Sequence, residues 1–142
     1  MRTLCAALLF VSAVTHAADF VLEMETGEAS RDASSSTTTF TVTGAELTVS
    51  YASRGRNADP ELAPEKKTVT LKEPAKVDAA LAAIRKSPEN KKKVVLKDTQ
   101  YQRGCLIEGS KKYCTTIASA DGTNARLTAL KVLQDLLYAS TF

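Results

Sequence analysis

Two cysteines, Cys105 and Cys114, have the spacing of a cross-strand disulfide. They flank Gly109-Ser110, a dipeptide that commonly forms the two-residue turn of a hairpin. Such a turn places the two cysteines directly opposite each other, as the fourth pair from the turn. This pair is non-hydrogen-bonded, and its Cα atoms are expected about 4.5 Å apart, within reach of a disulfide. The bond would close a loop of about ten residues and contribute roughly 2–3 kcal/mol to stability.

A redox or metal site is the functional alternative for these cysteines. Eight residues separate them, whereas both redox and zinc sites typically use Cys-x-x-Cys. We therefore expect Cys105 and Cys114 to be structural, with neither thiol free to act as a nucleophile.

Three glutamates, Glu23, Glu25 and Glu28, form the closest set of carboxylates. Phe20–Glu25 alternates between apolar and polar residues, which predicts a half-buried strand with Glu23 and Glu25 on one face and Glu28 just beyond. Paired carboxylates can perform acid–base hydrolysis, but one face of an antiparallel sheet is commonly solvated. With 6% aromatic residues and no Trp, the chain is also poorly provided for sugar stacking. A carboxylate-only hydrolase is therefore a minor alternative.

The first residues of the 142-residue chain predict export. Arg2 supplies a positive charge, Leu4–Val14 is an unbroken run of apolar or small residues, and Thr15-His16-Ala17 has the small residues of a cleavage site. The run is shorter than the ~20 residues of a membrane-spanning helix. We expect residues 1–17 to be a secretory signal peptide and residues 18–142 to be a single disulfide-stapled domain, periplasmic or extracellular, without a transmembrane segment.

Cleavage after Ala17 would remove His16, the only histidine, together with the third cysteine, Cys5. Histidine-dependent catalytic sites and histidine metal sites would then be excluded. No Ser-x-x-Lys motif offers lysine-assisted serine chemistry. The formal charge would fall from +3 to 18 − 16 = +2, which does not suggest a nucleic-acid partner. We expect no enzyme, no cofactor and no metal.

The longest irregular stretch, Ser53–Lys66, contains two prolines that exclude regular strand pairing. Loops of this length in a compact domain are often functional. Its candidate binding residues are Arg54, Gly55, Arg56, Asn57, Asp59 and Pro60. The leading interpretation is an exported, non-catalytic small domain that binds another macromolecule, with a protease inhibitor as the more specific version.

Lysines form three clusters, at the starts of strands or at a hairpin turn. Their structural role would be to protect sheet edges, because lysine on an edge strand discourages further pairing. Their functional role would be a basic patch for an anionic surface, such as lipid headgroups or envelope polymers. The alternative function is therefore an envelope-surface protein that associates electrostatically through Lys66, Lys67, Lys91, Lys92, Lys93, Lys111 and Lys112.

The pattern of apolar residues predicts the elements that position these groups. Thr38–Tyr51 predicts a hairpin around Gly44-Ala45, with one apolar face made of Phe40, Val42, Leu47 and Val49 between Thr38 and Tyr51. Lys67–Lys72, Val94–Lys97, Tyr101–Glu108 and Lys111–Ala118 predict strands, and the polar stretch Thr26–Ser36 predicts a solvated turn.

Two helices are predicted from apolar residues at helical spacing. The first follows Pro74, ends at Ser87-Pro88, and has an apolar stripe of Val77, Ala80, Leu81 and Ile84. The second follows a cap at Thr123 or Asn124 and has an apolar face of Ala129, Leu130, Leu133, Leu136 and Leu137.

These elements predict an α+β fold, in which a mainly antiparallel sheet of about seven strands packs two helices against one face. Lys66–Leu71 and Lys111–Ile117 each precede a helix. This similarity between the two halves raises the hypothesis of a duplicated strand–strand–helix unit.

Overall fold

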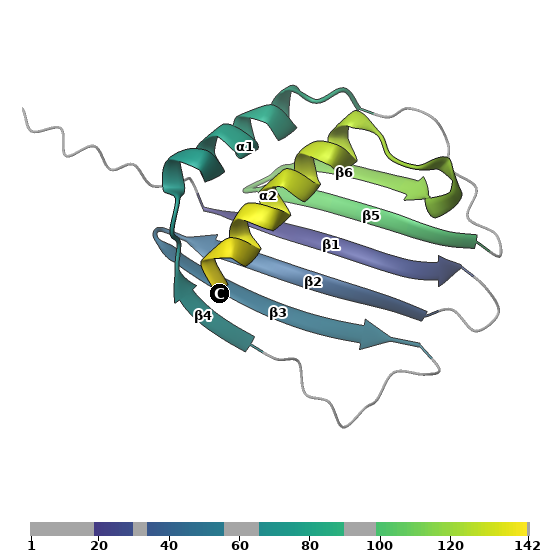
Figure 1. Cartoon of the computed structure of the whole chain (residues 1–142), viewed down its shortest axis with the longest axis horizontal. Helices are drawn as coiled ribbons and strands as arrows, with labels where there is room; N and C mark the ends of the chain where they lie inside the picture. Colours follow the sequence, from purple (N-terminus) through teal and green to yellow (C-terminus); the bar gives the residue numbers. More distant parts are fainter. Residues whose placement is uncertain (1–18, 30–33, 56–65, 90–98, 142) are drawn as a thin grey trace, which may run out of the picture.

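The computed structural model describes residues 19–29, 34–55, 66–89 and 99–141, and its ribbon is drawn in Figure 1. The elements in chain order are β1 (Phe20–Ala29), β2 (Ser34–Thr43), β3 (Glu46–Arg54), β4 (Lys66–Thr70), α1 (Pro74–Lys86), β5 (Thr99–Glu108), β6 (Lys111–Ala118), a 3₁₀ turn η1 (Ser119–Asp121) and α2 (Ala125–Thr141).

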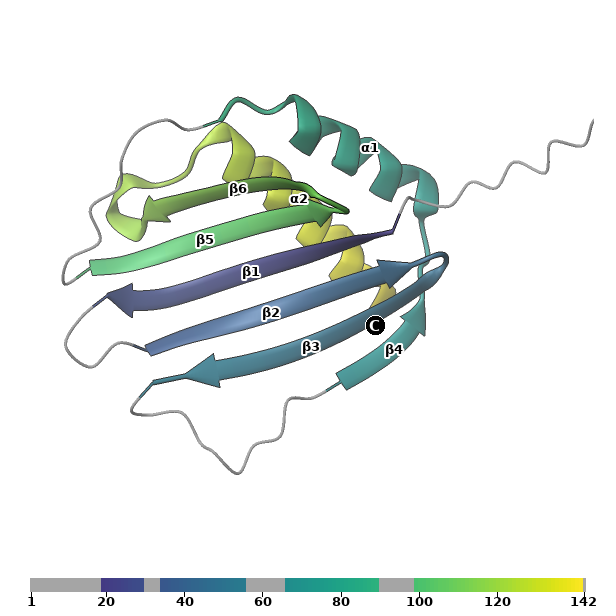
Figure 2. The same ribbon diagram turned by 180° about the vertical axis from the view of Figure 1, so that it is seen from behind.

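The strands form one sheet in the order β4-β3-β2-β1-β5-β6, and every neighbouring pair is antiparallel. Both helices lie on one face of the sheet, and Figure 2 shows the other face without a helix over it. The predicted α+β class is confirmed, with six strands in the described part of the chain where about seven were expected. The predicted strand Val94–Lys97 lies outside the described residues.

The two predicted hairpins are confirmed in their register. In the β2–β3 hairpin, Val42 pairs with Leu47, Phe40 with Val49 and Thr38 with Tyr51. Gly44 occupies the first turn position with a φ of 61°, a conformation that glycine adopts without a steric penalty. In the β5–β6 hairpin, Gly109 has a φ of 60° and Cys105 pairs with Cys114.

The solvated turn predicted over Thr26–Ser36 is wrong for most of its length. The β1–β2 ladder continues through Thr26↔Ser36, Gly27↔Ser35 and Glu28↔Ser34. Strand β1 is paired on both sides, with β2 and with β5. Backbone hydrogen bonds to both neighbours hold its polar half in strand conformation, although the side chains there show no strand pattern. Strand β3 also continues through Ser53 and Arg54, which the sequence placed in the irregular stretch.

The hydrophobic core lies between the sheet and the two helices. Helix α1 buries the four predicted stripe residues, and Pro74 stands in its first turn. Helix α2 buries Leu127, Leu130, Leu133 and Leu137, whereas Ala129 and Leu136 are partly buried. The helix can approach β5 closely because Gly104 has no side chain: a Cβ there would lie 2.8 Å from Leu130 Cδ1. The ring of Tyr138 packs edge-on against Phe40 at 5.0 Å.

Hydrogen bonds of Asn124 and Arg126 fix the start of α2, and those of Arg126 also join it to the end of α1. Asn124 caps α2, because its Oδ1 accepts a hydrogen bond of 2.8 Å from the Leu127 N–H. Arg126 is buried at 7% exposure, and its guanidinium donates to Ser87 Oγ, to the Ser87 carbonyl and to the Cys114 carbonyl. Since Ser87 is the C-cap of α1, the positive charge faces the negative end of that helix dipole.

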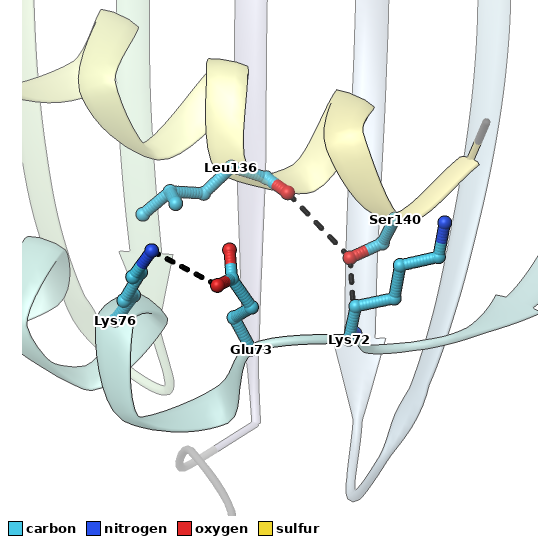
Figure 3. A network of polar contacts seen from close by, with 5 residues as sticks. All are labelled: Lys72, Glu73, Lys76, Leu136 and Ser140. Carbon is cyan, nitrogen blue, oxygen red and sulfur yellow. Dashed lines mark hydrogen bonds and ion pairs between the residues drawn. The ribbon is translucent and has the colours of Figure 1, made fainter.

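The last turn of α2 is joined to the segment between β4 and α1, as Figure 3 shows. The buried hydroxyl of Ser140 accepts a hydrogen bond of 3.1 Å from the Lys72 N–H and donates to the Leu136 carbonyl. Nearby, Lys67 Nζ donates to the Thr141 carbonyl at 2.8 Å. These bonds hold the C-terminal end of α2 over the β4 side of the sheet.

Each half of the described chain ends in an antiparallel strand pair followed by a helix. β3–β4–α1 lies at one edge of the sheet and β5–β6–α2 at the other. The duplication hypothesis remains a prediction, to be checked by superposing these two units.

Candidate ligand-binding groove

The helix-bearing face of the sheet changes from apolar to polar along four adjacent strands. Paired residues form rows of side chains that cross this face, because every second residue of a strand points the same way. An apolar row consists of Val49, Phe40, Leu22 and Leu106. Two rows further, the corresponding positions are Ser53, Ser36, Thr26 and Gln102. The core therefore ends in a row of hydroxyl and carboxamide groups while all four strands continue.

Helix α2 crosses the sheet diagonally and leaves this polar end of β1, β2 and β3 uncovered by a helix (Figure 1). Two adjoining cavities, of about 620 and 350 Å³, lie there. Both are lined by Thr26, Ser36, Tyr51 and Gln102, and we call them together the polar groove. Lys131 and Gln134 of α2 line the smaller cavity, and the larger falls within the 300–1,000 Å³ range of ordinary ligand sites.

Tyr51, on β3, lines both cavities of the polar groove. It is one of two large hydrophobic side chains that are exposed in the described part of the chain, with 49% of its surface accessible. Its hydroxyl donates a hydrogen bond of 3.0 Å to Ser36 Oγ on the neighbouring strand. The ring is thus anchored at its polar tip while much of its surface is open to solvent.

The charged groups of the groove are few and of both signs. Glu28 and Arg54 line the larger cavity, and Lys131 lines the smaller one. Glu25 and Arg103 also border the smaller cavity, but they occupy strand positions that face the helix-free side of the sheet. Most of the remaining lining groups are neutral hydroxyls and carboxamides. The described part of the groove therefore has no concentration of charge of one sign that would select an anion or a cation.

Tyr101 of β5 forms a side-chain hydrogen bond to β1 next to the groove. Its hydroxyl donates a hydrogen bond of 2.6 Å to Glu25 Oε1. This hydrogen bond, together with burial and the charge of Glu25, raises the pKa of Tyr101 above its ordinary value of 10.0. Tyr101 stays protonated at neutral pH and continues to act as the donor.

The predicted binding loop is described only at its first two candidate residues. Arg54 is the exposed last residue of β3 and lines the larger cavity of the groove. Gly55 follows with a φ of 120°. Arg56, Asn57, Asp59 and Pro60 lie outside the described residues.

The lysine clusters lie at opposite edges of the sheet where the structure describes them. Lys66 and Lys67 begin β4, and Lys111 and Lys112 begin β6. Five strand spacings separate these two strands, which is roughly 24 Å. Lys91, Lys92 and Lys93 lie outside the described residues. The structure therefore does not bring the described lysines into a single patch.

The predicted disulfide is confirmed, with the Cα atoms of Cys105 and Cys114 4.1 Å apart. It lies on the face of the sheet that carries no helix, where Cys105 is the β5 neighbour of Glu23. Glu23 and Glu25 share this face, whereas Glu28 points to the polar groove. Within the described ranges, no three metal-ligating side chains converge on one point.

The sequence pattern did not predict the polar groove. Its signal was the continuation of the inward-facing positions beyond the apolar run, from Met24 to Thr26 in β1 and from Phe40 back to Ser36 in β2. A polar stretch of this kind resembles a loop unless a partner strand on each side is known.

The sequence matches no protein-family model and no curated protein. Among the described residues, no helix has the length and apolar character that a bilayer crossing requires.

Proposed function

We propose that this protein is an exported, non-catalytic small domain that binds another macromolecule, and that the polar groove is its binding surface. The observation that carries the proposal is the groove itself: four paired strands hold a row of polar side chains at a fixed spacing beside α2. Side chains on regular elements are held more precisely than side chains on loops, which favours recognition.

Export is supported by the sequence of residues 1–17 and by the Cys105–Cys114 pair, since disulfides persist in oxidising compartments. The stapled hairpin includes β5, which supplies Gln102 to the groove. The disulfide therefore stiffens one of the four strands on which the groove is built.

The two alternatives find less support. An envelope-surface protein held by lysines would need one basic face, but the described clusters start strands at opposite edges of the sheet. A carboxylate-only hydrolase would need convergent acids, but Glu28 faces away from Glu23 and Glu25. A hydrolase would lose its activity on Glu23→Gln.

Site-specific photo-crosslinking tests the proposed surface. A photoreactive phenylalanine analogue replaces Tyr51 in the groove, and in a matched control it replaces Thr41, which is exposed on the helix-free face. The oxidised protein is incubated with its own secreted or envelope fraction and irradiated. We expect covalent adducts from position 51 and none from position 41. Equal labelling at both positions, or no adduct from position 51, would contradict the proposal.

The protease-inhibitor version depends on the segment that begins with Arg54 and Gly55. Replacing residues 54–60 should abolish inhibition of a secreted protease while the fold, checked by circular dichroism, persists. If no protease in a broad panel is slowed by the unmodified protein, the inhibitor version is wrong.

A further inference from the structure

We infer that the ligand of the polar groove is a neutral oligosaccharide segment of a larger glycan. This inference rests on the proposed function, because it names the chemical class that the same groove would bind. It follows from the kinds of polar group that line the groove, from the exposed ring of Tyr51 and from the position of the groove within the sheet.

The lining groups match the hydrogen-bonding character of sugars. A sugar hydroxyl both donates and accepts, and so does the hydroxyl of a serine or threonine. The carboxamide of a glutamine offers one acceptor oxygen and two donor hydrogens in fixed positions. Ser36, Thr26 and Gln102 stand side by side in one row, so adjacent hydroxyls of one chain could be paired without any charge.

Although aromatic residues are only 6% of the chain, the ring of Tyr51 is placed to supply the apolar contact that a sugar also requires. An aromatic side chain of this type presents an apolar body and a polar tip. Here the tip is bonded to Ser36 Oγ, and 49% of the residue is exposed beside the polar row. The C–H face of a pyranose ring can lie on this surface while its hydroxyls reach the row.

The other ligand classes fit the groove less well. A peptide that adds to a sheet needs a free strand edge. Within the described residues the only such edge at the groove is Tyr51–Arg54 of β3, beyond its pairing with β4, so an added strand would lie beside the groove and not across it. A peptide anchored by its side chains would need apolar pockets at the centre of its interface. Nucleic acid and other polyphosphates require clustered Lys and Arg, whereas the groove mixes Glu28 with Arg54 and Lys131.

The test is an NMR titration of the oxidised, isotopically labelled protein. The probes are three neutral tetrasaccharides, of β-1,4-glucose, α-1,4-glucose and β-1,4-N-acetylglucosamine. Inorganic phosphate and a neutral Ala/Ser hexapeptide serve as ligands of other classes. We expect at least one tetrasaccharide to shift the backbone amides of Thr26, Ser36 and Gln102, with no shift at Thr41 on the opposite face.

Two variants of Tyr51 distinguish the contribution of the ring to saccharide binding from that of its hydroxyl. Tyr51→Ala should weaken saccharide binding about tenfold, and Tyr51→Phe by no more than about threefold, because the ring surface persists. Val132→Ala is the matched control, since Val132 is exposed to 51% on α2 and does not line either cavity. Amide spectra of each variant verify that the fold is retained.

The outcomes separate the ligand class from the proposed function. If the hexapeptide or phosphate shifts the groove amides and no tetrasaccharide does, the saccharide inference is wrong while the groove remains a binding surface. If no probe shifts those amides, the inference is again overturned, and the crosslinking from position 51 decides the proposed function independently. Saccharide shifts that survive Tyr51→Ala unchanged would also overturn the argument from the ring.

Discussion

Tyr101 lies directly opposite Gly27 in the β1–β5 ladder, and its ring occupies the space that a side chain at Gly27 would fill. A Cβ at Gly27 would lie 2.6 Å from the phenol oxygen of Tyr101 and 2.9 Å from the Ser34 carbonyl oxygen. The missing side chain thus lets the phenol lie over β1, where it reaches Glu25. Gly27 is required by its surroundings and not by an unusual backbone conformation.

Gly27→Ala should destabilise the fold by about 1–3 kcal/mol, because the added methyl overlaps the Tyr101 ring. The sign is diagnostic, since replacing glycine with alanine within a strand ordinarily stabilises by roughly 0.5–1 kcal/mol. Urea unfolding of the two proteins measures the difference. In a Tyr101→Ala background the loss should shrink, and an unchanged loss would show that the Tyr101 ring is not its cause.

The hydrogen bond from Tyr101 to Glu25 should raise the pH at which the Tyr101 hydroxyl ionises. The folded pKa of Tyr101 is raised above 10.0, so the stability it contributes is present below the unfolded pKa and is lost as the pH rises through the folded pKa. Glu25→Gln should lower the pKa of Tyr101 by removing the charged acceptor. Ultraviolet absorbance during alkaline titration follows the phenolate, and Tyr101→Phe identifies the late transition. A titration unaffected by Glu25→Gln would contradict the assignment.

Loss of the Cys105–Cys114 bond should reduce the free energy of unfolding by roughly 2–3 kcal/mol. The double variant Cys105→Ala/Cys114→Ala and the reduced protein should unfold at similarly lower urea concentrations. Thiol titration of the native protein is the direct check, with no free thiol expected. Two free thiols would show that the pair is not bonded in the natural protein.

Arg126 should contribute far more to stability than Arg85, although both make several hydrogen bonds. Arg126→Met leaves partly buried acceptors at Ser87 and Cys114 without their donor, which should cost about 2–3 kcal/mol. Arg126→Lys should rescue little, because one ammonium cannot reproduce the planar fork of donors.

Arg85→Met is the matched control for Arg126. It breaks a two-bond ion pair with Glu108, but the Arg85 side chain is 40% exposed, so the loss should be at most about 1 kcal/mol. Urea midpoints of the three variants compare the two arginines. A larger loss for Arg85→Met than for Arg126→Met would contradict the role assigned to burial.

Local patterns in the sequence were sufficient for much of the fold. Phe40, Val42, Leu47 and Val49 share a face only if the turn lies at Gly44-Ala45, so turn chemistry and alternation specify the same register. The same agreement at Gly109-Ser110 places the two cysteines opposite each other. Both helices follow from apolar residues at helical spacing and from Pro74 and Asn124 at their starts.

The polar halves of β1 and β2 could not be predicted in this way. Thr26, Glu28 and Ser36 carry no apolar alternation, and their strand conformation depends on pairing between segments distant in the chain. Gln102 of β5, for example, is 76 residues from its partner Thr26. The polar groove lies on this part of the sheet, so it was missed together with the strands that form it.

The hairpin registers, the disulfide pair, the two helices and the α+β class can be predicted from the sequence, because each depends on residues close together in the chain. The strand order, the placement of the lysines on opposite edges and the end of the sheet that α2 leaves uncovered are visible only in the folded structure. Those features depend on how distant segments pair and on where a helix crosses. Pairing of β5 with β1, for example, is what brings Tyr101 into contact with Gly27 and Glu25. The polar side chains of a strand gain most of their neighbours from the strands beside it.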